Sequence, residues 1–195
     1  MLSSKESLKV LRKTNALLEG HFVLSSGLHS DRYIQCAKLL SFPKLSQKIC
    51  HSLSRKIKKK FKKIDLILSP AIGGIIIGYE IGKILNKETI FCERVYKKFT
   101  LRRGFQIKKN AKVLIVEDVI TTGKSSLECV SLIKKAKARL IGFACIIDRS
   151  NKSSLKIKNK ALVSQLKIEA KTFKKNKIPA YLKEIPISSP GSRRI

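Results

Sequence analysis

The pattern of apolar and polar positions changes period along the middle of the chain, and it predicts strands and helices in turn. Residues 113–116 and 140–147 are apolar without alternation, which is typical of parallel strands covered on both faces. Between them, residues 124–139 place apolar side chains at helical spacing. Alternating strands and helices indicate an α/β fold with a central parallel sheet flanked by helices.

The remaining segments are assigned in the same way. The predicted elements are a helix over 3–19 ended by Gly20, hairpin strands over 22–24 and 32–35, a helix from Pro43, a strand over 64–69, a helix over 74–85, and strands over 89–92, 113–116, 140–147 and 161–166. A chain of 195 residues suits one domain. We expect a core at about 42–170, with residues 1–40 and 171–195 forming a small hood over the carboxyl edge of the sheet.

Two acidic residues follow the strand at 113–116. Glu117 and Asp118 should lie at its carboxyl end rather than inside it, because buried carboxylates are costly and open α/β sheets bind ligands at that edge. The next residues form a turn that opens a helix, where free N–H groups and the helix dipole favour a phosphate, helped by hydroxyls at Thr121, Thr122 and Ser125. The two carboxylates would then reach ribose hydroxyls. An ordinary buried strand and capped helix would leave the acidic pair unexplained.

These residues resemble the phosphoribosyl-diphosphate (PRPP) motif of type I phosphoribosyltransferases. Residues 20–35 resemble the substrate-side hairpin of the orotate phosphoribosyltransferases, residues 69–74 resemble their diphosphate loop, and the pair Asp148 and Arg149 follows a later strand as it does there. The resemblance spans most of the chain. It implies the type I phosphoribosyltransferase fold, a pentosyltransferase activity on PRPP and orotate, Mg²⁺ carried in by PRPP rather than held in a protein cage, and a homodimer whose loops contact the neighbouring subunit's site.

The resemblance also assigns residues to each part of the site. PRPP binding falls to Glu117, Asp118, Val119, Ile120, Thr121, Thr122, Gly123, Lys124 and Ser125. The diphosphate loop is Ser69, Pro70, Ala71, Ile72, Gly73 and Gly74, and the cations of a mobile basic loop are Arg94, Lys97, Lys98, Arg102 and Arg103. Orotate is assigned to Ser25, Tyr33, Thr121 and Arg149, and catalysis to Asp118, Glu117 and Lys98.

Several of these assignments have a plainer alternative. Residues 69–74 could form an ordinary turn before a helix, residues 93–103 a solvated basic loop, and Arg149 the anchor of a surface loop. The chain also departs from the family pattern, which has lysines where Ser25 and Gly73 stand, and a longer loop with a histidine that is absent between residues 93 and 104.

The charge of the chain suggests a different kind of partner. A formal net charge of +30, with dense basic runs at 56–63 and 171–177, would ordinarily indicate nucleic acid. The basic residues are spread along the whole chain and each run holds a single aromatic residue, so a lysine-biased composition on solvated faces is the preferred interpretation and nucleic acid is not the expected partner. A purine-type phosphoribosyltransferase and a PRPP-sensing nucleic-acid-binding regulator remain the alternatives.

Cysteine usage and hydropathy bear on the compartment. Five cysteines in apolar contexts without metal-ligand spacing are typical of reduced core thiols. No continuous apolar stretch is long enough for a signal sequence or a membrane span. A cytoplasmic protein is expected.

Overall fold

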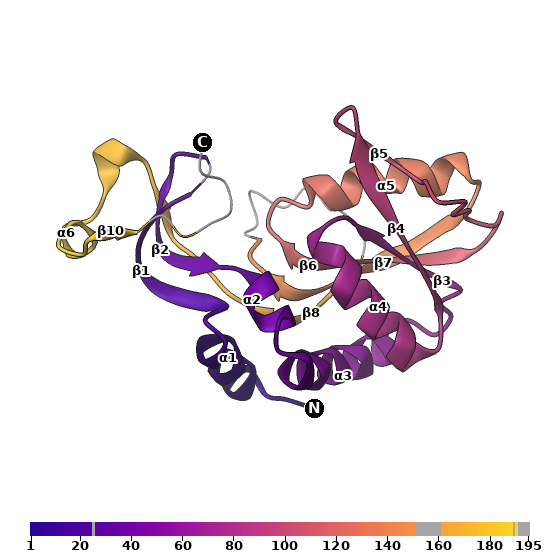
Figure 1. Cartoon of the computed structure of the whole chain (residues 1–195), viewed down its shortest axis with the longest axis horizontal. Helices are drawn as coiled ribbons and strands as arrows, with labels where there is room; N and C mark the ends of the chain where they lie inside the picture. The colour runs from indigo at the N-terminus through magenta and orange to yellow at the C-terminus, as the bar shows by residue number, and fades with distance from the viewer. Residues whose placement is uncertain (25, 151–160, 189, 191–195) are drawn as a thin grey trace.

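A six-stranded sheet forms the centre of the computed structural model, which describes residues 1–24, 26–150, 161–188 and 190 (Figure 1). The strand order is β5-β4-β3-β6-β7-β8. Its members are β3 (Leu66–Pro70), β4 (Glu88–Val95), β5 (Lys98–Thr100), β6 (Lys112–Ile120), β7 (Arg139–Asp148) and β8 (Leu162–Lys167). All neighbours are parallel except β4 and β5. The predicted α/β fold is therefore confirmed.

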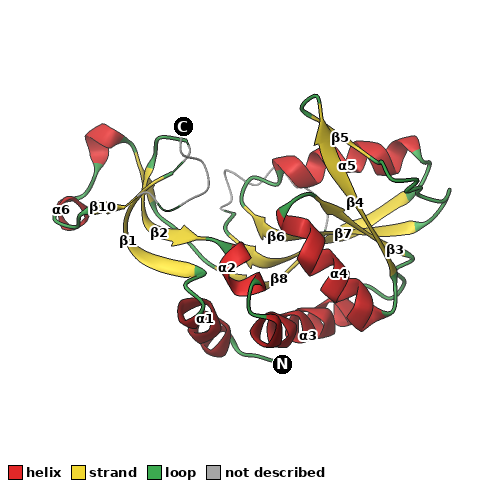
Figure 2. Cartoon of the chain, viewed as in Figure 1, coloured by secondary structure: helices red, strands yellow, loops and turns green. Residues whose placement is uncertain are grey.

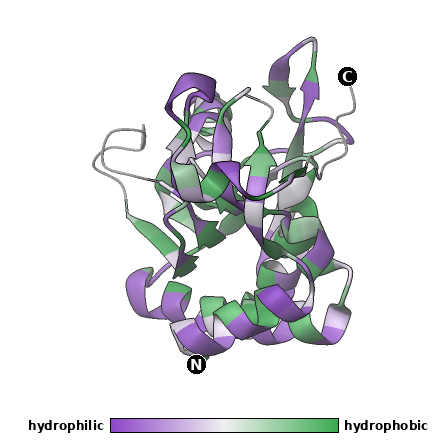
Figure 3. Cartoon of the chain, turned by 90° about the vertical axis from the view of Figure 1, so that its left-hand side faces the viewer, coloured by the Kyte–Doolittle hydropathy of each residue, from purple (hydrophilic) through white to green (hydrophobic). Residues whose placement is uncertain are grey.

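Helices cover both faces of this sheet (Figure 2). One face packs against α3 (Pro43–Lys60) and α4 (Gly73–Leu85), and the other against α5 (Lys124–Lys135). Along β6, Leu114 and Val116 join the first apolar cluster, whereas Val113 and Ile115 join the second. Both sets of side chains are fully buried, which explains why the strand shows no polar alternation. Figure 3 shows hydrophobic segments gathered along the inner strands and hydrophilic ones on the outer helix faces and loops.

The two ends of the chain build a second, four-stranded sheet in the order β10-β1-β2-β9 (Figure 1). These strands are β1 (Leu17–Val23), β2 (His29–Ile34), β9 (Thr172–Phe173) and β10 (Ile187–Ser188), with η1 (Lys175–Lys177) and α6 (Ala180–Lys183) in between. Two buried histidines fix the sheet: His21 Nε2 lies 2.6 Å from His29 Nδ1, and His21 Nδ1 lies 3.3 Å from the Ile185 carbonyl oxygen. We call this sheet the hood.

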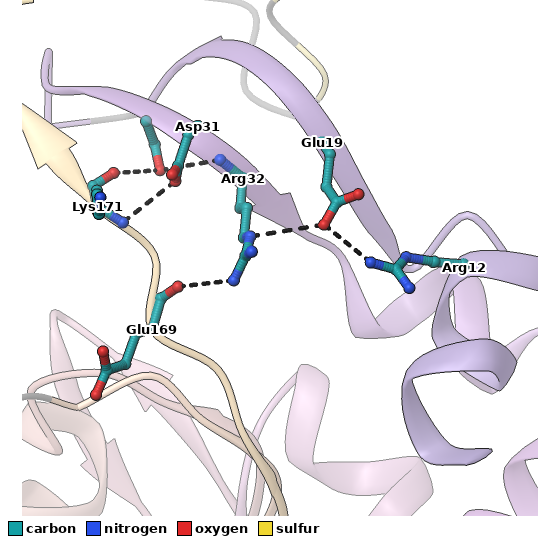
Figure 4. A network of polar contacts seen from close by, with 7 residues as sticks. Arg12, Glu19, Asp31, Arg32, Glu169 and Lys171 are labelled. Carbon is teal, nitrogen blue, oxygen red and sulfur yellow. Dashed lines mark hydrogen bonds and ion pairs between the residues drawn. The ribbon is translucent and has the colours of Figure 1, made fainter. Parts of the chain in front are cut away.

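Polar contacts attach the N-terminal part of the chain to β8 and to the residues after it. α1 (Ser4–Lys13) packs against β8, where the Gln165 amide donates to Ser7 Oγ at 2.8 Å. Figure 4 shows a polar network in which Glu19 of β1 pairs with Arg12 and Arg32, and Arg32 donates to the Glu169 carbonyl after β8. Because these ion pairs are exposed, they orient the hood more than they stabilise it.

Several sequence-based boundaries are wrong. The first helix ends at Lys13 because Asn15 adopts a left-handed conformation, and β1 begins at Leu17, so Gly20 lies inside a strand. The five-residue α2 (Cys36–Leu40) was not predicted. β4 extends to Val95 and turns directly into β5. Within the described residues, no helix is long and apolar enough to cross a membrane.

Candidate active site

A hollow of about 180 Å³ lies where β6 turns into α5. It is lined by Glu117 and by every residue from Val119 to Ser125. Gly123 has a φ of 71°, a left-handed conformation that favours glycine, and it is the N-cap of the helix. Thr122 Oγ1 accepts the Lys124 N–H at 3.3 Å. The first N–H groups of α5 therefore face the hollow with the positive end of the helix dipole, which suits a phosphate.

Glu117 lies on the face of the sheet that α5 covers. Its carboxylate is 8% exposed and accepts a short hydrogen bond from the hydroxyl of Ser126 in α5. Burial raises the pKa of Glu117 to about 7, Ser126 opposes that rise, and the charge of Asp118 adds to it. A carboxyl group that titrates near neutrality beside a phosphate-sized hollow is typical of a functional site.

Asp118 faces the other side of the same strand. Its Oδ1 accepts the Val119 N–H at 2.9 Å, and burial raises the pKa of this carboxyl above its ordinary value. The acidic pair lies near the carboxyl end of β6, as predicted, but the expectation that the strand excludes it is wrong, because β6 continues without a bulge from Leu114 to Ile120. The strand tolerates both carboxylates because Glu117 is held by Ser126, and Asp118 remains half-buried beside a backbone N–H.

The segment resembling a diphosphate loop meets Asp118 directly. β3 ends at Pro70, the Ala71 N–H donates to the Cys92 carbonyl at 2.7 Å, and α4 begins at Gly73 without a side-chain cap. A Cβ at Gly73 would lie 2.7 to 2.8 Å from three atoms of the Asp118 carboxyl group. A side chain at residue 73 would therefore crowd the Asp118 carboxyl group. Sequence reasoning missed this contact between residues 45 positions apart.

Arg149 follows β7 and sits beside the end of β6, where its N–H donates to the Ile120 carbonyl at 2.8 Å. Its guanidinium Nε is buried and has no hydrogen-bond partner among the described residues, and burial lowers the pKa of the group. The neighbouring carboxylate of Asp148 does not pair with it, because Asp148 Oδ1 accepts hydrogen bonds from the N–H and the hydroxyl of Ser150. Arg149 is thus an unpaired cation, within the described part of the chain, next to the loop that begins at Thr121.

The other two residues assigned to orotate are less informative. Tyr33 lies in the hood sheet, where its ring centroid is 5.8 Å from that of Phe22. Ser25 lies outside the described residues. The structure therefore groups Arg149 and Thr121 at the sheet edge and places Tyr33 in the hood. Cys36, just after β2, joins hood and site through a contact of 3.9 Å from its Sγ to the Asp118 carbonyl oxygen.

The predicted basic loop is instead a hairpin of β4 and β5, with a two-residue turn at Tyr96 and Lys97. Arg94 pairs with Glu128 at 2.7 Å, and Arg102 and Arg103 approach Glu93 at 3.9 and 3.4 Å. Lys97 and Lys98 pair with no carboxylate side chain, and all 13 aspartates and glutamates of the chain lie in its described part. These two lysines are therefore the cations of the hairpin without a carboxylate partner among the described side chains.

No group of three or more His, Cys, Asp or Glu side chains within the described residues is arranged to hold a metal ion. All five cysteines are free and buried, as predicted.

Comparisons with known proteins agree with this geometry. The family model described as "Phosphoribosyl transferase domain" matches residues 37–184. The orotate phosphoribosyltransferase of Erythrobacter litoralis is 42% identical over 98% of this chain and 99% of its own, and that of Caldicellulosiruptor bescii is 43% identical over 96% of each. The crystal structure of orotate phosphoribosyltransferase from Aeropyrum pernix superposes with a TM-score of 0.72 at 25% identity, over 82% of this chain and 92% of the other.

Proposed function

The chain belongs to the phosphoribosyltransferase family, with full-length orotate phosphoribosyltransferases among its relatives, and from this we infer that it transfers the ribose 5-phosphate group of PRPP to orotate. The products are orotidine 5′-monophosphate and diphosphate, a step of pyrimidine nucleotide synthesis. The observation that carries the inference is the hollow at the start of α5 with Glu117 on its wall and Asp118 on the same strand.

The substrate is held at its phosphate end. The N–H groups of the first turn of α5 and the hydroxyls of Thr121, Thr122 and Ser125 bind the 5′-phosphate. Lys124 lies on the same wall and adds a positive charge. Binding energy from this non-reacting end orients the anomeric carbon, where the chemistry occurs.

The two carboxylates act on the ribose. The bond from the anomeric carbon to diphosphate breaks while a ring nitrogen of orotate bonds to that carbon, so positive charge develops on the sugar. Asp118 and ionised Glu117 accept hydrogen bonds from the ribose hydroxyls, and their negative charge stabilises this cation. Because the side chains leave β6 on opposite faces, we assign the ribose contact first to Asp118, which lies against the diphosphate loop.

The leaving diphosphate needs positive partners. The uncapped N-terminus of α4 supplies N–H groups from Gly73 and Gly74, and Lys98 supplies a charge from the hairpin. Members of this family are generally Mg²⁺-dependent, and the residues fit an ion that arrives on PRPP. Asp118 is the carboxylate that would hold such an ion beside the diphosphate loop, and the ion would neutralise negative charge on the leaving diphosphate.

Arg149 is assigned to the base. A guanidinium presents a planar fork that matches a carboxylate, and orotate differs from uracil by its carboxylate. The support is the buried Nε without a described partner, beside the loop that binds ribose phosphate. The carboxylate of orotate would supply that partner.

The outer face of α4 supports a homodimer. Ile72, Ile76 and Tyr79 form one stripe and are 85%, 51% and 63% exposed, and Tyr96 at the tip of the hairpin is 95% exposed. Exposed apolar side chains gathered on one helix are typical of an interface. Sedimentation velocity on the wild-type protein and on the variant with Ile76→Glu and Tyr79→Glu tests this, and a monomeric wild type would refute it.

We place the protein in the cytoplasm. Its five cysteines are all free and buried, which suits a reducing compartment.

The reaction is tested by supplying PRPP and Mg²⁺ with orotate, uracil, hypoxanthine, adenine and xanthine in turn, and following the loss of each base. We expect loss of orotate alone. Consumption of a purine would assign the chain to the purine-type enzymes, and loss of none would favour a PRPP-sensing regulator. Asp118→Asn is expected to abolish most turnover while leaving the melting temperature unchanged, and full activity in that variant would remove Asp118 from the site.

A further inference from the structure

A second hollow, of about 350 Å³, lies at the opposite edge of the central sheet from the active site. It is lined by Lys60, Phe61, Lys62, Lys63, Lys112 and Ile141. Lys112 begins β6 and Ile120 ends it, so about eight residue steps of about 3.3 Å, or roughly 26 Å, separate this hollow from the phosphate loop. It cannot be part of the site for PRPP and orotate.

Three segments that are distant in sequence create it. Phe61 is the C-cap of α3, and the loop after it leads to β3. Its ring packs on Gly142 of β7, where a Cβ would lie only 2.5 Å from the Phe61 Cζ. Lys112 is held in place by Asp65, whose carboxylate accepts the Lys112 N–H at 2.8 Å while the Asp65 N–H donates to the Lys112 carbonyl at 2.9 Å. The apolar part of the hollow is thus fixed by core packing.

The lysines around it are not neutralised by carboxylate side chains. Lys60, Lys62, Lys63 and Lys112 take part in no ion pair with any of the 13 aspartates and glutamates, all of which lie in the described part of the chain. Lysines in the last turn of a helix stabilise its dipole, and this accounts for Lys60. Lys62, Lys63 and Lys112 lie outside the helix, so the dipole gives no reason for them.

We propose that this hollow is a second binding site for a nucleoside phosphate. Its apolar part is formed by half-buried Ile141 and by the small exposed fraction of Phe61, 9%; a planar base lies against this part, and the surrounding lysines bind the phosphate groups as compact cations. Its volume falls within the ordinary range for small-molecule sites, about 300 to 1,000 Å³. A mononucleotide fits better than a nucleic acid strand, because Phe61 is the one aromatic residue here and offers no platform for successive bases.

The test is calorimetric titration of the full-length protein with adenosine 5′-diphosphate, which is neither a substrate nor a product of the proposed reaction. We expect one nucleotide bound per chain. The double variant Lys63→Glu and Lys112→Glu should weaken binding by about tenfold or more, because charge-assisted hydrogen bonds to phosphate are lost. Its melting temperature and far-UV circular dichroism should stay at the wild-type values, which shows that it has folded.

Two control variants distinguish binding in this hollow from binding elsewhere on the chain. Lys59 is exposed in the last turn of α3, next to Lys60, but it does not line the hollow. Lys59→Glu should therefore alter the affinity for the nucleotide by no more than about twofold. Asp118→Asn should not alter it at all. The proposal is overturned if the nucleotide does not bind, if Lys59→Glu weakens binding as much as the double variant, or if Asp118→Asn abolishes it.

Two further ligands test the chemistry of the hollow. Inorganic diphosphate should displace the bound nucleotide only at concentrations at least about tenfold higher than unlabelled adenosine 5′-diphosphate needs, because diphosphate leaves the apolar part empty. Equal affinities would show that the lysines attract any polyanion and would overturn the proposal. A single-stranded RNA of about twenty nucleotides that displaces the nucleotide at lower concentration would also overturn it, in favour of a nucleic-acid surface. None of these outcomes depends on whether orotate is the substrate.

Discussion

Gly73→Ala is the substitution whose effect follows most directly from the geometry of the site. The added Cβ would lie 2.7 Å from Asp118 Oδ2 and 2.8 Å from Cγ and Oδ1. Ordinary contacts of a Cβ begin at 3.4 Å, so the carboxylate has to retreat by about 0.7 Å, the difference between 3.4 and 2.7 Å. Because a displacement of about 1 Å can cost about a hundredfold in rate, we expect kcat/KM to fall by about ten- to a hundredfold.

Stability should change in the opposite direction. Gly73 is exposed in the first turn of α4, where alanine restricts the unfolded chain more than glycine does. Gly73→Ala should therefore leave the free energy of unfolding unchanged or raise it by about 0.5 to 1 kcal/mol. Urea unfolding followed by circular dichroism measures this, and the loss of orotate absorbance measures kcat/KM.

A double-mutant cycle tests whether the effect passes through Asp118. Asp118→Ala removes the carboxylate that the new Cβ would meet, so adding Gly73→Ala to that variant should lower kcat/KM no further. Wild-type activity in the Gly73→Ala single variant would refute the reasoning. So would a loss of the same factor in both backgrounds.

Four further results are expected. Burial raises the pKa of Glu117 from an ordinary 4.5 to about 7, so between these pH values the folded chain holds a proton that the unfolded chain has lost. The free energy of unfolding, measured by urea titration, should therefore fall as pH rises from 4.5 to about 7. The fall should be less steep in Glu117→Gln, which has no carboxyl group to titrate. Ser126→Ala removes the hydrogen bond that opposes this rise, so the acidic limb of the kcat/KM profile should move to higher pH. Gly142→Ala forces a Cβ against Phe61 and should cost about 2 kcal/mol in chemical denaturation. Lys98→Ala should lower kcat/KM by about tenfold or more without changing the melting temperature.

The sequence predicted the type of an element correctly where a long segment has a regular apolar pattern. The apolar run before Glu117, the turn at Gly123 and the helix after it were all correct in type, because each is fixed by local composition. The end of β6 was misplaced because the rule against buried carboxylates does not foresee a hydroxyl such as Ser126 arriving from the next helix.

The hood and the hairpin were beyond local reasoning. β9 and β10 have two residues each and show no period, so their pairing with β1 and β2 depends on contacts between opposite ends of the chain. The sequence of the hairpin does not show which of its arginines and lysines form ion pairs. Only the fold shows that Arg94 is committed to Glu128 while Lys98 is not.

Because the hood joins strands from both ends of the chain, its sheet cannot be completed until the last strands have been synthesised. β8, the last strand of the central sheet, ends at Lys167, so every strand of that sheet is synthesised before β9 and β10. β1 and β2 leave the ribosome first, yet they gain their outer neighbours only when β9 and β10 follow. For that interval the hairpin exposes two unpaired edges, and a chain released before residue 172 would keep them exposed and prone to aggregation.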